Sequence, residues 1–251
     1  MPDPLRDLTD IRRFSNAWRL VTEKRVEALT DRLIAGEITL SEWQLQMKDE
    51  LRHANHMQFV IGKGGMKEGI APTEYLKLGT ELSRQYRYLQ RFADEIAERD
   101  DQGLGIEFAR ARAKLYAKST QAVMWRSAVP VDLPQVPRDG RTACGTNCKC
   151  RLDFDYQRGE QGEVTAVEVY WKMRPAEHCM DCVELAREWS PLVIPTEGMQ
   201  QAGLARGGGM AQAVALLLTD LQLSSEDEGT LREMWGLDVK GGKTCKVTSA
   251  A

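Results

Sequence analysis

Apolar residues recur every three or four positions along the first half of the chain, which is the spacing that places them on one face of an α-helix. Thr39 and Glu42 form a capping box, the pair of side chains that satisfies free backbone donors where a helix begins. We read the glycine-rich residues 61–72 as a linker, and residues 1–14 as a loose, charged lead-in. The predicted helices cover residues 15–35, 40–59, a segment opened by Thr73 whose apolar stripe ends at Ile96, and 104–125.

The helical spacing stops at residues 130–140, where three prolines precede an Asp-Gly pair, and this is the clearest boundary in the chain. Beyond it, residues 151–156 and 164–171 alternate between apolar and polar, which is the period of a β-strand. Turn-forming residues 157–162 separate the two runs, so the pattern predicts a β-hairpin. A short helix, VELAREW, is expected over 183–189.

The remaining residues, 193–251, have a different character. Residues 193–209 read as a loop that ends in glycines, and 210–223 read as an apolar helix that is too short to span a bilayer. That helix is expected to dock on the core or on a neighbouring subunit, so a homo-oligomer stays open as an alternative. The small, polar tail after it carries Cys245, which we expect to be a free thiol.

Composition narrows the class of protein further. The chain has 251 residues, 42% of them hydrophobic, which is enough for a packed core and argues against general disorder. With 37 acidic and 34 basic residues its net charge is −3, which does not suit a general nucleic-acid coat. We expect no membrane span, because there is no apolar run of about 18 residues. The charged N-terminus has no apolar region typical of a secretory signal.

The cysteines are distributed unevenly, because the first 143 residues contain none and five of the six lie between residues 144 and 182. Pairs of close thiols joined by a spacer are the arrangement that a tetrahedral zinc ion needs. An antiparallel hairpin would bring the two groups together, since one precedes its first strand and the other follows its second. We therefore predict a structural zinc site with about one ion per chain, and disulfides or free thiols remain alternatives. The candidate ligands are Cys144, Cys148, Cys150, Cys179, Cys182 and His178.

The sequence motifs give less support for an enzymatic role. The order Glu177-His178-Cys179 does not match the zinc deaminase pattern, and five nearby thiols favour a closed site without an open position for water. His53 and His56 lie three positions apart on a predicted helix, but no carboxylate completes a recognised metal motif there. We identify no nucleophile with a partner base in the sequence, so we expect a protein that is not an enzyme. A metal-dependent enzyme built on His178 and the thiols is the weakest hypothesis.

The fourth predicted helix is basic, and no acidic residue occurs between Phe108 and Val131. A solvated helix face explains such a run, and contact with DNA or with an acidic partner is the functional alternative. The candidate contact residues are Arg110, Arg112, Lys114 and Lys118.

The ordered motifs resemble a known family. The helical part contains RLIAGEITLSEWQLQMKDELRHANHMQFVIGKGG, EYLKLGTELSRQYRYLQRFADEIA and ARARAKLYAKS, and the cysteine-bearing part contains DGRTACGTNCKCRL and EHCMDCVELAREWSPL. Over residues 25–192 this order is similar to minor head proteins of tailed bacteriophages, within the broader phage head morphogenesis family. The resemblance implies a virion structural or assembly protein made in the host cytoplasm, with capsid or portal proteins as partners. It transfers no catalytic residue to this chain.

Together these observations predict an α+β chain in three parts. Residues 1–129 form a helical region, 140–192 a zinc-stapled β-hairpin module, and 193–251 a loop, an apolar helix and a tail. The leading hypothesis is a non-enzymatic phage head component that acts through protein–protein contacts near the capsid or portal. The alternative is a zinc-ribbon regulatory protein that binds nucleic acid through its basic helix.

Overall fold

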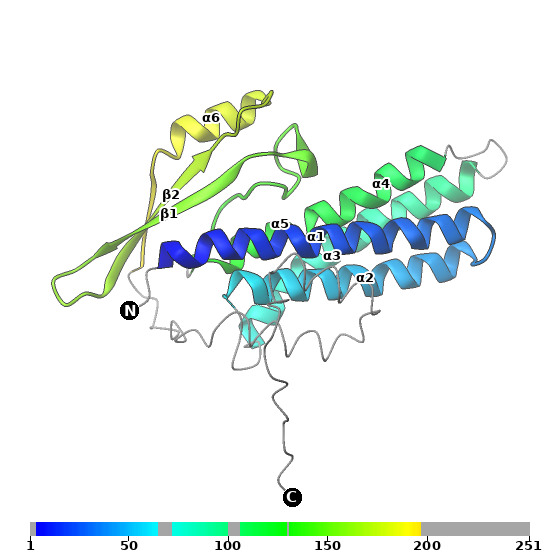
Figure 1. Ribbon diagram of the computed structural model, residues 1–251, viewed down its shortest axis with the longest axis horizontal. Coiled ribbons are helices and arrows are strands. Elements are labelled where there is room, and N and C mark those ends of the chain that lie inside the picture. Colours follow the sequence, from blue (N-terminus) through cyan, green and yellow to red (C-terminus); the bar gives the residue numbers. More distant parts are fainter. Residues whose placement is uncertain (1–3, 65–71, 100–105, 130, 197–251) are drawn as a thin grey trace, which may run out of the picture.

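The computed structural model describes residues 4–64, 72–99, 106–129 and 131–196. Helices α1 to α4 run lengthwise beside one another, and a small sheet with helix α6 lies at one end of them (Figure 1). The predicted α+β class is confirmed for this part of the chain. The predicted helix over 210–223 and Cys245 lie outside the described residues. None of the described helices is both long and apolar enough to cross a membrane.

Helix α1 (Pro4–Ile34) begins well before the predicted start at residue 15. The prediction of a loose lead-in over 1–14 was therefore wrong for residues 4–14. The reason is that Leu8, Ile11 and Phe14 continue the helical spacing backwards and are buried in the core. Proline is compatible with a first helical position, because the backbone N–H that it lacks has no partner there in any helix.

Helix α2 (Leu40–Gly62) begins at the predicted capping box. The Thr39 hydroxyl accepts from the Glu42 amide at 3.2 Å, and the Glu42 carboxylate accepts from the Thr39 amide at 2.8 Å. The helix runs to Gly62, into the segment predicted as a linker, because glycine permits a very close approach to α5 (Gln121–Ser127) at that point. A Cβ atom on Gly62 would lie 1.9 Å from Ser127 Oγ.

Helix α3 spans Pro72–Arg99. The predicted helix over 104–125 is two helices, α4 (Ile106–Ser119) and α5. The break lies at the buried Thr120, whose hydroxyl donates to the Ala117 carbonyl at 2.8 Å and competes with regular helical bonding.

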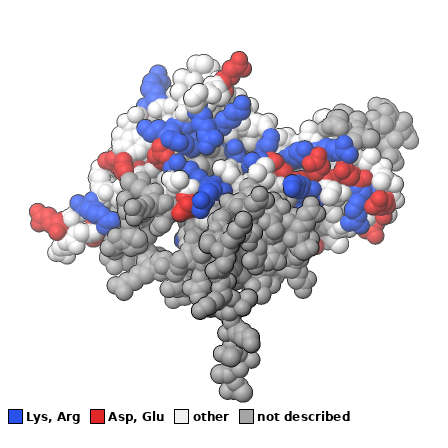
Figure 2. All heavy atoms as spheres, in the orientation of Figure 1, with Lys and Arg blue, Asp and Glu red and all other residues white. Residues whose placement is uncertain are grey.

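The helices enclose a buried cluster of their own. The helical spacing of apolar residues predicted for the first half of the chain is confirmed on α2, where Trp43, Met47 and Leu51 are fully buried. Trp43 packs edge to face on Phe92 of α3, with ring centroids 5.7 Å apart. Outside this core the charges are mixed: on the face drawn in Figure 2, Lys and Arg lie beside Asp and Glu over the helical part.

The predicted hairpin is confirmed as strands β1 (Arg151–Arg158) and β2 (Val164–Lys172), paired antiparallel with Leu152 opposite Trp171. A third strand, β3 (Leu192–Pro195), pairs antiparallel with β2 and extends the sheet in the order β1-β2-β3. The prediction of a loop from residue 193 onwards was therefore wrong for this short strand. Four residues are too few to show a strand period in the sequence. Helix α6 spans Met180–Glu188, three residues earlier at its start than expected.

A second buried cluster runs from the first half of α1 through α5 to the sheet. Trp125 of α5 packs on Phe154 of β1 with ring centroids 6.3 Å apart, and Arg12 of α1 forms an ion pair with Asp153 of β1 at 2.6 Å. Residues 131–136, in the predicted boundary segment, contribute Val131, Leu133 and Val136 to the same cluster. The three-part division of the chain stays a prediction, although these contacts join the helices to the sheet.

Candidate metal centre

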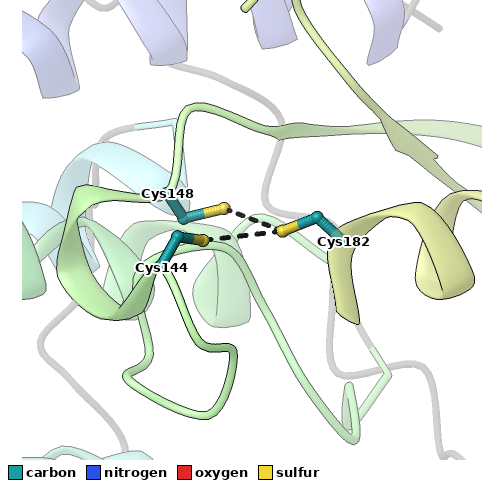
Figure 3. A group of neighbouring side chains, drawn as sticks. All are labelled: Cys144, Cys148 and Cys182. Atoms are coloured by element: carbon teal, nitrogen blue, oxygen red, sulfur yellow. Dashed lines mark hydrogen bonds between the residues drawn. The ribbon is translucent and has the colours of Figure 1, made fainter. Parts of the chain in front are cut away.

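Three thiols meet where the loop before β1 approaches the start of α6 (Figure 3). Cys144 and Cys148 flank a short 3-10 helix, η2 (Gly145–Asn147), and Cys182 lies in the first turn of α6. Cys182 Sγ is 3.6 Å from Cys144 Sγ and 3.7 Å from Cys148 Sγ, and all three sulfurs lie within 4.8 Å of one another. Because the hairpin returns the chain to its own start, groups far apart in the sequence converge as predicted.

The spacing of these sulfurs suits a tetrahedral metal site. Zinc–thiolate bonds of about 2.3 Å place the four sulfurs of a tetrahedral site about 3.8 Å apart. The two separations from Cys182 are 3.6 and 3.7 Å, whereas a disulfide would need about 2.05 Å. The five cysteines between 144 and 182 are free thiols. The arrangement is compatible with a structural metal and does not match the disulfide alternative.

Cys179 supplies a fourth thiol. It is the N-cap residue of α6, three positions before Cys182, and its sulfur lies outside the set of three that are all within 4.8 Å of one another. Burial raises the pKa of Cys179, but hydrogen bonds from the backbone and thiols of Cys182 and Cys144 outweigh it and lower the pKa below its ordinary value. A lowered pKa favours the thiolate, which is the form that binds metal.

Cys150 and His178 form a separate pair beside these thiols. Cys150 Sγ lies 3.5 Å from His178 Nδ1, and His178 Nε2 lies 2.6 Å from the Arg174 carbonyl oxygen. A carbonyl oxygen only accepts, so Nε2 carries the hydrogen of this contact, and in the neutral ring Nδ1 then has the free lone pair. Cys150 lies two residues after Cys148, directly before the first residue of β1.

Crowding raises the cost of ionising the central thiols. A hydrogen bond with the Cys150 thiol, together with burial, raises the pKa of Cys148 far above its usual range. Burial and the neighbouring charge of Cys148 raise the pKa of Cys182. Several thiolates this close repel one another, and a divalent cation between them would remove that repulsion. The donor set is soft and mostly sulfur, which suits zinc better than magnesium or calcium.

Backbone and side-chain contacts hold the loop that carries Cys144 and Cys148. Asp181 of α6 accepts a hydrogen bond from the Ala143 amide at 2.7 Å. This bond connects the loop before β1 to α6 independently of the thiols. Arg138, at a left-handed φ of 72°, donates from Nε to the Cys148 carbonyl at 3.0 Å. Burial and the positive charge of Arg19 lower the pKa of Arg138 to about 10.

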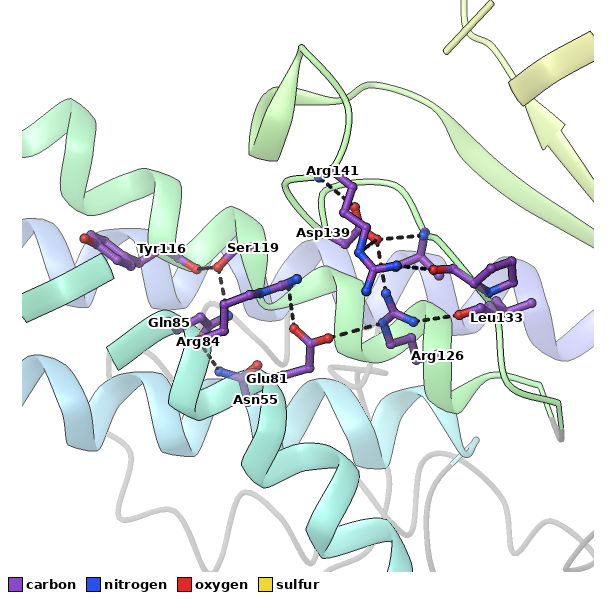
Figure 4. A network of polar contacts seen from close by, with 12 residues as sticks. Asn55, Glu81, Arg84, Gln85, Tyr116, Ser119, Arg126, Leu133, Asp139 and Arg141 are labelled. Carbon is purple, nitrogen blue, oxygen red and sulfur yellow. Dashed lines mark hydrogen bonds and ion pairs between the residues drawn. The ribbon is translucent and has the colours of Figure 1, made fainter. Parts of the chain in front are cut away.

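A buried polar network fixes the start of the same loop to the helices (Figure 4). The Asp139 side chain is 1% exposed and accepts hydrogen bonds from the Val136 amide and from Arg126 Nη2, both at 3.1 Å. Arg126 of α5 also donates to the Leu133 carbonyl at 2.8 Å and forms an ion pair with Glu81 of α3 at 3.4 Å. The network therefore sets the position of the loop relative to α3 and α5.

Sequence reasoning missed the supporting residues Arg138, Asp139 and Asp181. The Asp-Gly pair at 139–140 was interpreted only as a turn signal, and its partner Arg126 lies in a different predicted element. A turn aspartate that follows a proline-rich segment carries no sign of a buried ion pair. Asp181 lies between Cys179 and Cys182, and only that position could have drawn attention to it.

The four basic residues of α4 all contact other side chains of the chain. The first three are about one-third exposed, which is typical of ion pairs at the edges of helix contacts. These pairings hold α4 against α1, α3 and η2, and a contact with nucleic acid stays a prediction. The contacts are Arg110 with Asp31 at 2.6 Å, Arg112 with Glu95 at 3.1 Å, Lys114 with Glu27 at 2.9 Å, and Lys118 with Asn147 at 3.0 Å.

His53 and His56 do not converge with the thiols. The ring of His53 lies against Trp18, with centroids 5.6 Å apart, and burial lowers the pKa of His53 to about 4. His53 is therefore a neutral imidazole that packs against Trp18.

Comparison of the chain with protein-family models, with curated proteins and with solved structures finds no match.

Proposed function

We propose that Cys144, Cys148, Cys179 and Cys182 bind one structural zinc ion. The observation that carries this proposal is the separation of Cys182 Sγ from its two neighbours across the loop, 3.6 and 3.7 Å, close to the edge of a zinc tetrathiolate. The ion would join the loop before β1 to the start of α6. A three-stranded sheet of this size has little core of its own, so such a joint would contribute much of its stability.

Four thiolates leave no open coordination position, which is the mark of a structural zinc site. A catalytic zinc keeps one position for water or substrate and usually takes three protein ligands. With Cys179 as the fourth ligand, the site would have one sulfur ligand more than a catalytic site needs. We therefore propose a protein that is not an enzyme.

At the level of the whole protein, we propose a minor head or head morphogenesis component of a tailed bacteriophage. The support is the ordered resemblance over residues 25–192, together with a long helical part suited to protein–protein contacts. Its partners would be capsid or portal proteins. Assembly in the reducing host cytoplasm, followed by a place in the virion, agrees with thiols that bind metal instead of forming disulfides.

Mass spectrometry of purified virions tests this assignment. We expect peptides of this chain in the particles, and defective heads when its gene is deleted. Genes for a portal, terminase or capsid protein next to it would agree. Particles that lack the chain, with normal heads formed in its absence, would contradict the proposal.

A DNA-binding experiment tests the alternative that the protein is a regulator that binds nucleic acid. Salt-dependent DNA binding that weakens when Arg110 and Arg112 are replaced would favour a regulator, because phosphate contacts release counterions. Both arginines already form ion pairs within the helices, with Asp31 and Glu95. For this reason we prefer the structural assignment.

A further inference from the structure

Three free thiols meet around Cys182, and they differ in their access to solvent. Cys182 Sγ is 3.6 Å from Cys144 Sγ and 3.7 Å from Cys148 Sγ (Figure 3). Cys148 and Cys182 are fully buried, whereas Cys144 is partly exposed. A small oxidant in solution therefore reaches the Cys144 sulfur first among these three, and the Cys182 sulfur is already beside it.

We propose that Cys144 and Cys182 form a reversible disulfide when the protein reacts with a hydroperoxide, and that this bond releases the zinc ion. The release of zinc rests on the proposed function, whereas the bond itself needs only the two thiols. A sulfur in a disulfide is no longer a thiolate, so the metal loses two of its four proposed ligands at once. The pair acts as an oxidation-sensitive switch at the joint between the loop before β1 and α6.

The reaction has two balanced steps. The Cys144 sulfur attacks one oxygen of hydrogen peroxide, the O–O bond breaks, and the products are a sulfenic acid on Cys144 and one water molecule. The Cys182 sulfur then attacks the sulfenic sulfur, the S–O bond breaks, and the disulfide forms. The hydroxyl group leaves with the proton of the Cys182 thiol as a second water molecule. Two thiols are oxidised to one disulfide, and the peroxide is reduced to water.

A contact outside the thiols holds the two segments together independently of a metal. The Asp181 carboxylate accepts a hydrogen bond from the Ala143 amide at 2.7 Å, and these two residues directly precede Cys182 and Cys144. The loop and α6 therefore stay side by side when zinc leaves. To form the bond, the two sulfurs approach from 3.6 Å to about 2 Å through rotation of their side chains.

Peptide mapping of the full chain tests the pairing directly. The chain is stripped of metal with a chelator, treated with hydrogen peroxide, alkylated with N-ethylmaleimide and digested without reduction. We expect a peptide pair joined through Cys144 and Cys182, and full reversal by dithiothreitol. No joined pair, or a bond from Cys144 or Cys182 to another cysteine instead, would overturn the assignment.

The Cys182→Ser variant tests the order of the two steps. Without the second sulfur the sulfenic acid on Cys144 persists, so dimedone, which reacts with sulfenic acids, should label Cys144 in the variant but not in the wild type. The control is Cys245→Ser, which also lacks one thiol and should form the disulfide as the wild type does. Equal labelling of Cys144 in wild type and Cys182→Ser would overturn the role of Cys182. The wild-type peptide map decides the pairing even where this variant unfolds.

Zinc release separates this inference from the proposed zinc site. In the zinc-loaded chain, peroxide should release the ion to a chromogenic chelator in step with the formation of the disulfide. Zinc binding without any Cys144–Cys182 bond after metal removal and oxidation would overturn the inference and leave the zinc site. A disulfide in a chain that never binds zinc would remove the zinc site and its release, and leave the bond.

Discussion

Cys148 Sγ lies 3.7 Å from Cys182 Sγ, although the two residues are 34 positions apart in the chain. One follows η2 and the other lies in the first turn of α6, so a bond through a shared metal would connect segments on either side of the hairpin. The sheet packs on α1 and α5 through the buried cluster that contains both cysteines. The state of these thiols should therefore govern the stability of the whole sheet end of the molecule.

Replacing Cys182 with serine is expected to destabilise the sheet more than any surface substitution. Structural zinc contributes folding free energy directly, on the order of 10 kcal/mol in zinc-finger peptides, and a large part of that contribution should be lost here. Thermal unfolding followed by circular dichroism, with and without a chelator, measures the effect. The control is Cys245→Ser, outside the cysteine group. Equal melting temperatures for wild type and Cys182→Ser would count against the prediction.

Asp139→Asn should lower the free energy of unfolding by about 2–3 kcal/mol, because it removes a carboxylate that is paired with the partly buried Arg126. Denaturant titration measures the change. The matched control is Asp10→Asn, which breaks an ion pair to Arg13 whose side chains are 51% and 55% exposed, and should cost at most about 1 kcal/mol. Similar losses of unfolding free energy in the two variants would show that the Asp139 network stabilises the fold no more than an exposed ion pair does.

Gly62→Ala is expected to destabilise the helices by about 1–3 kcal/mol, because the new methyl would lie 2.5 Å from the Met124 carbonyl as well as against Ser127. Gly79→Ala on α3 provides the comparison, since no atom lies within 4 Å of its added Cβ. That variant should gain up to about 1 kcal/mol from higher helix propensity. The opposite order of stabilities would refute the close packing of α2 on α5.

His53 should make the protein less stable as the pH falls from about 6.5 to about 4. Burial lowers its pKa to about 4 in the folded state, while the unfolded chain keeps a value near 6.5. The unfolded state therefore binds more protons in this window, and stability present above it is lost on acidification. After allowance for partial exposure, the contribution is about 1–2 kcal/mol.

The difference between wild type and His53→Gln isolates this contribution, because metal release at low pH affects both proteins alike. Urea titrations at several pH values between 4 and 7 provide the data. The difference in the free energy of unfolding between wild type and His53→Gln should change between about pH 6.5 and about pH 4. A constant difference would mean that His53 is not a buried neutral group.

Much of the site could be predicted because its signals are local. The alternation of residues 151–156 and 164–171 predicts the hairpin, and the cysteines at its two ends then have to meet. The capping box at Thr39 could be predicted in the same way, because its partner Glu42 lies three residues further along the chain. In each case the residues that interact lie within one element or at the ends of one turn.

The rest depends on contacts between distant elements, which a single sequence does not reveal. Asp139 acquires its role only when α5 places Arg126 beside it. The tautomer of His178 depends on the carbonyl of Arg174, which any residue type at that position could supply. The short strand β3 exists because β2 offers a free edge, and its four residues carry little signal of their own.

The zinc content of the full chain, measured after purification under reducing conditions, tests the central claim most directly. We predict at least one zinc ion per chain, retained through gel filtration and lost together with thermal stability in Cys182→Ser. A chain that holds no zinc even after refolding in its presence, and that melts as Cys182→Ser does, would contradict the metal centre.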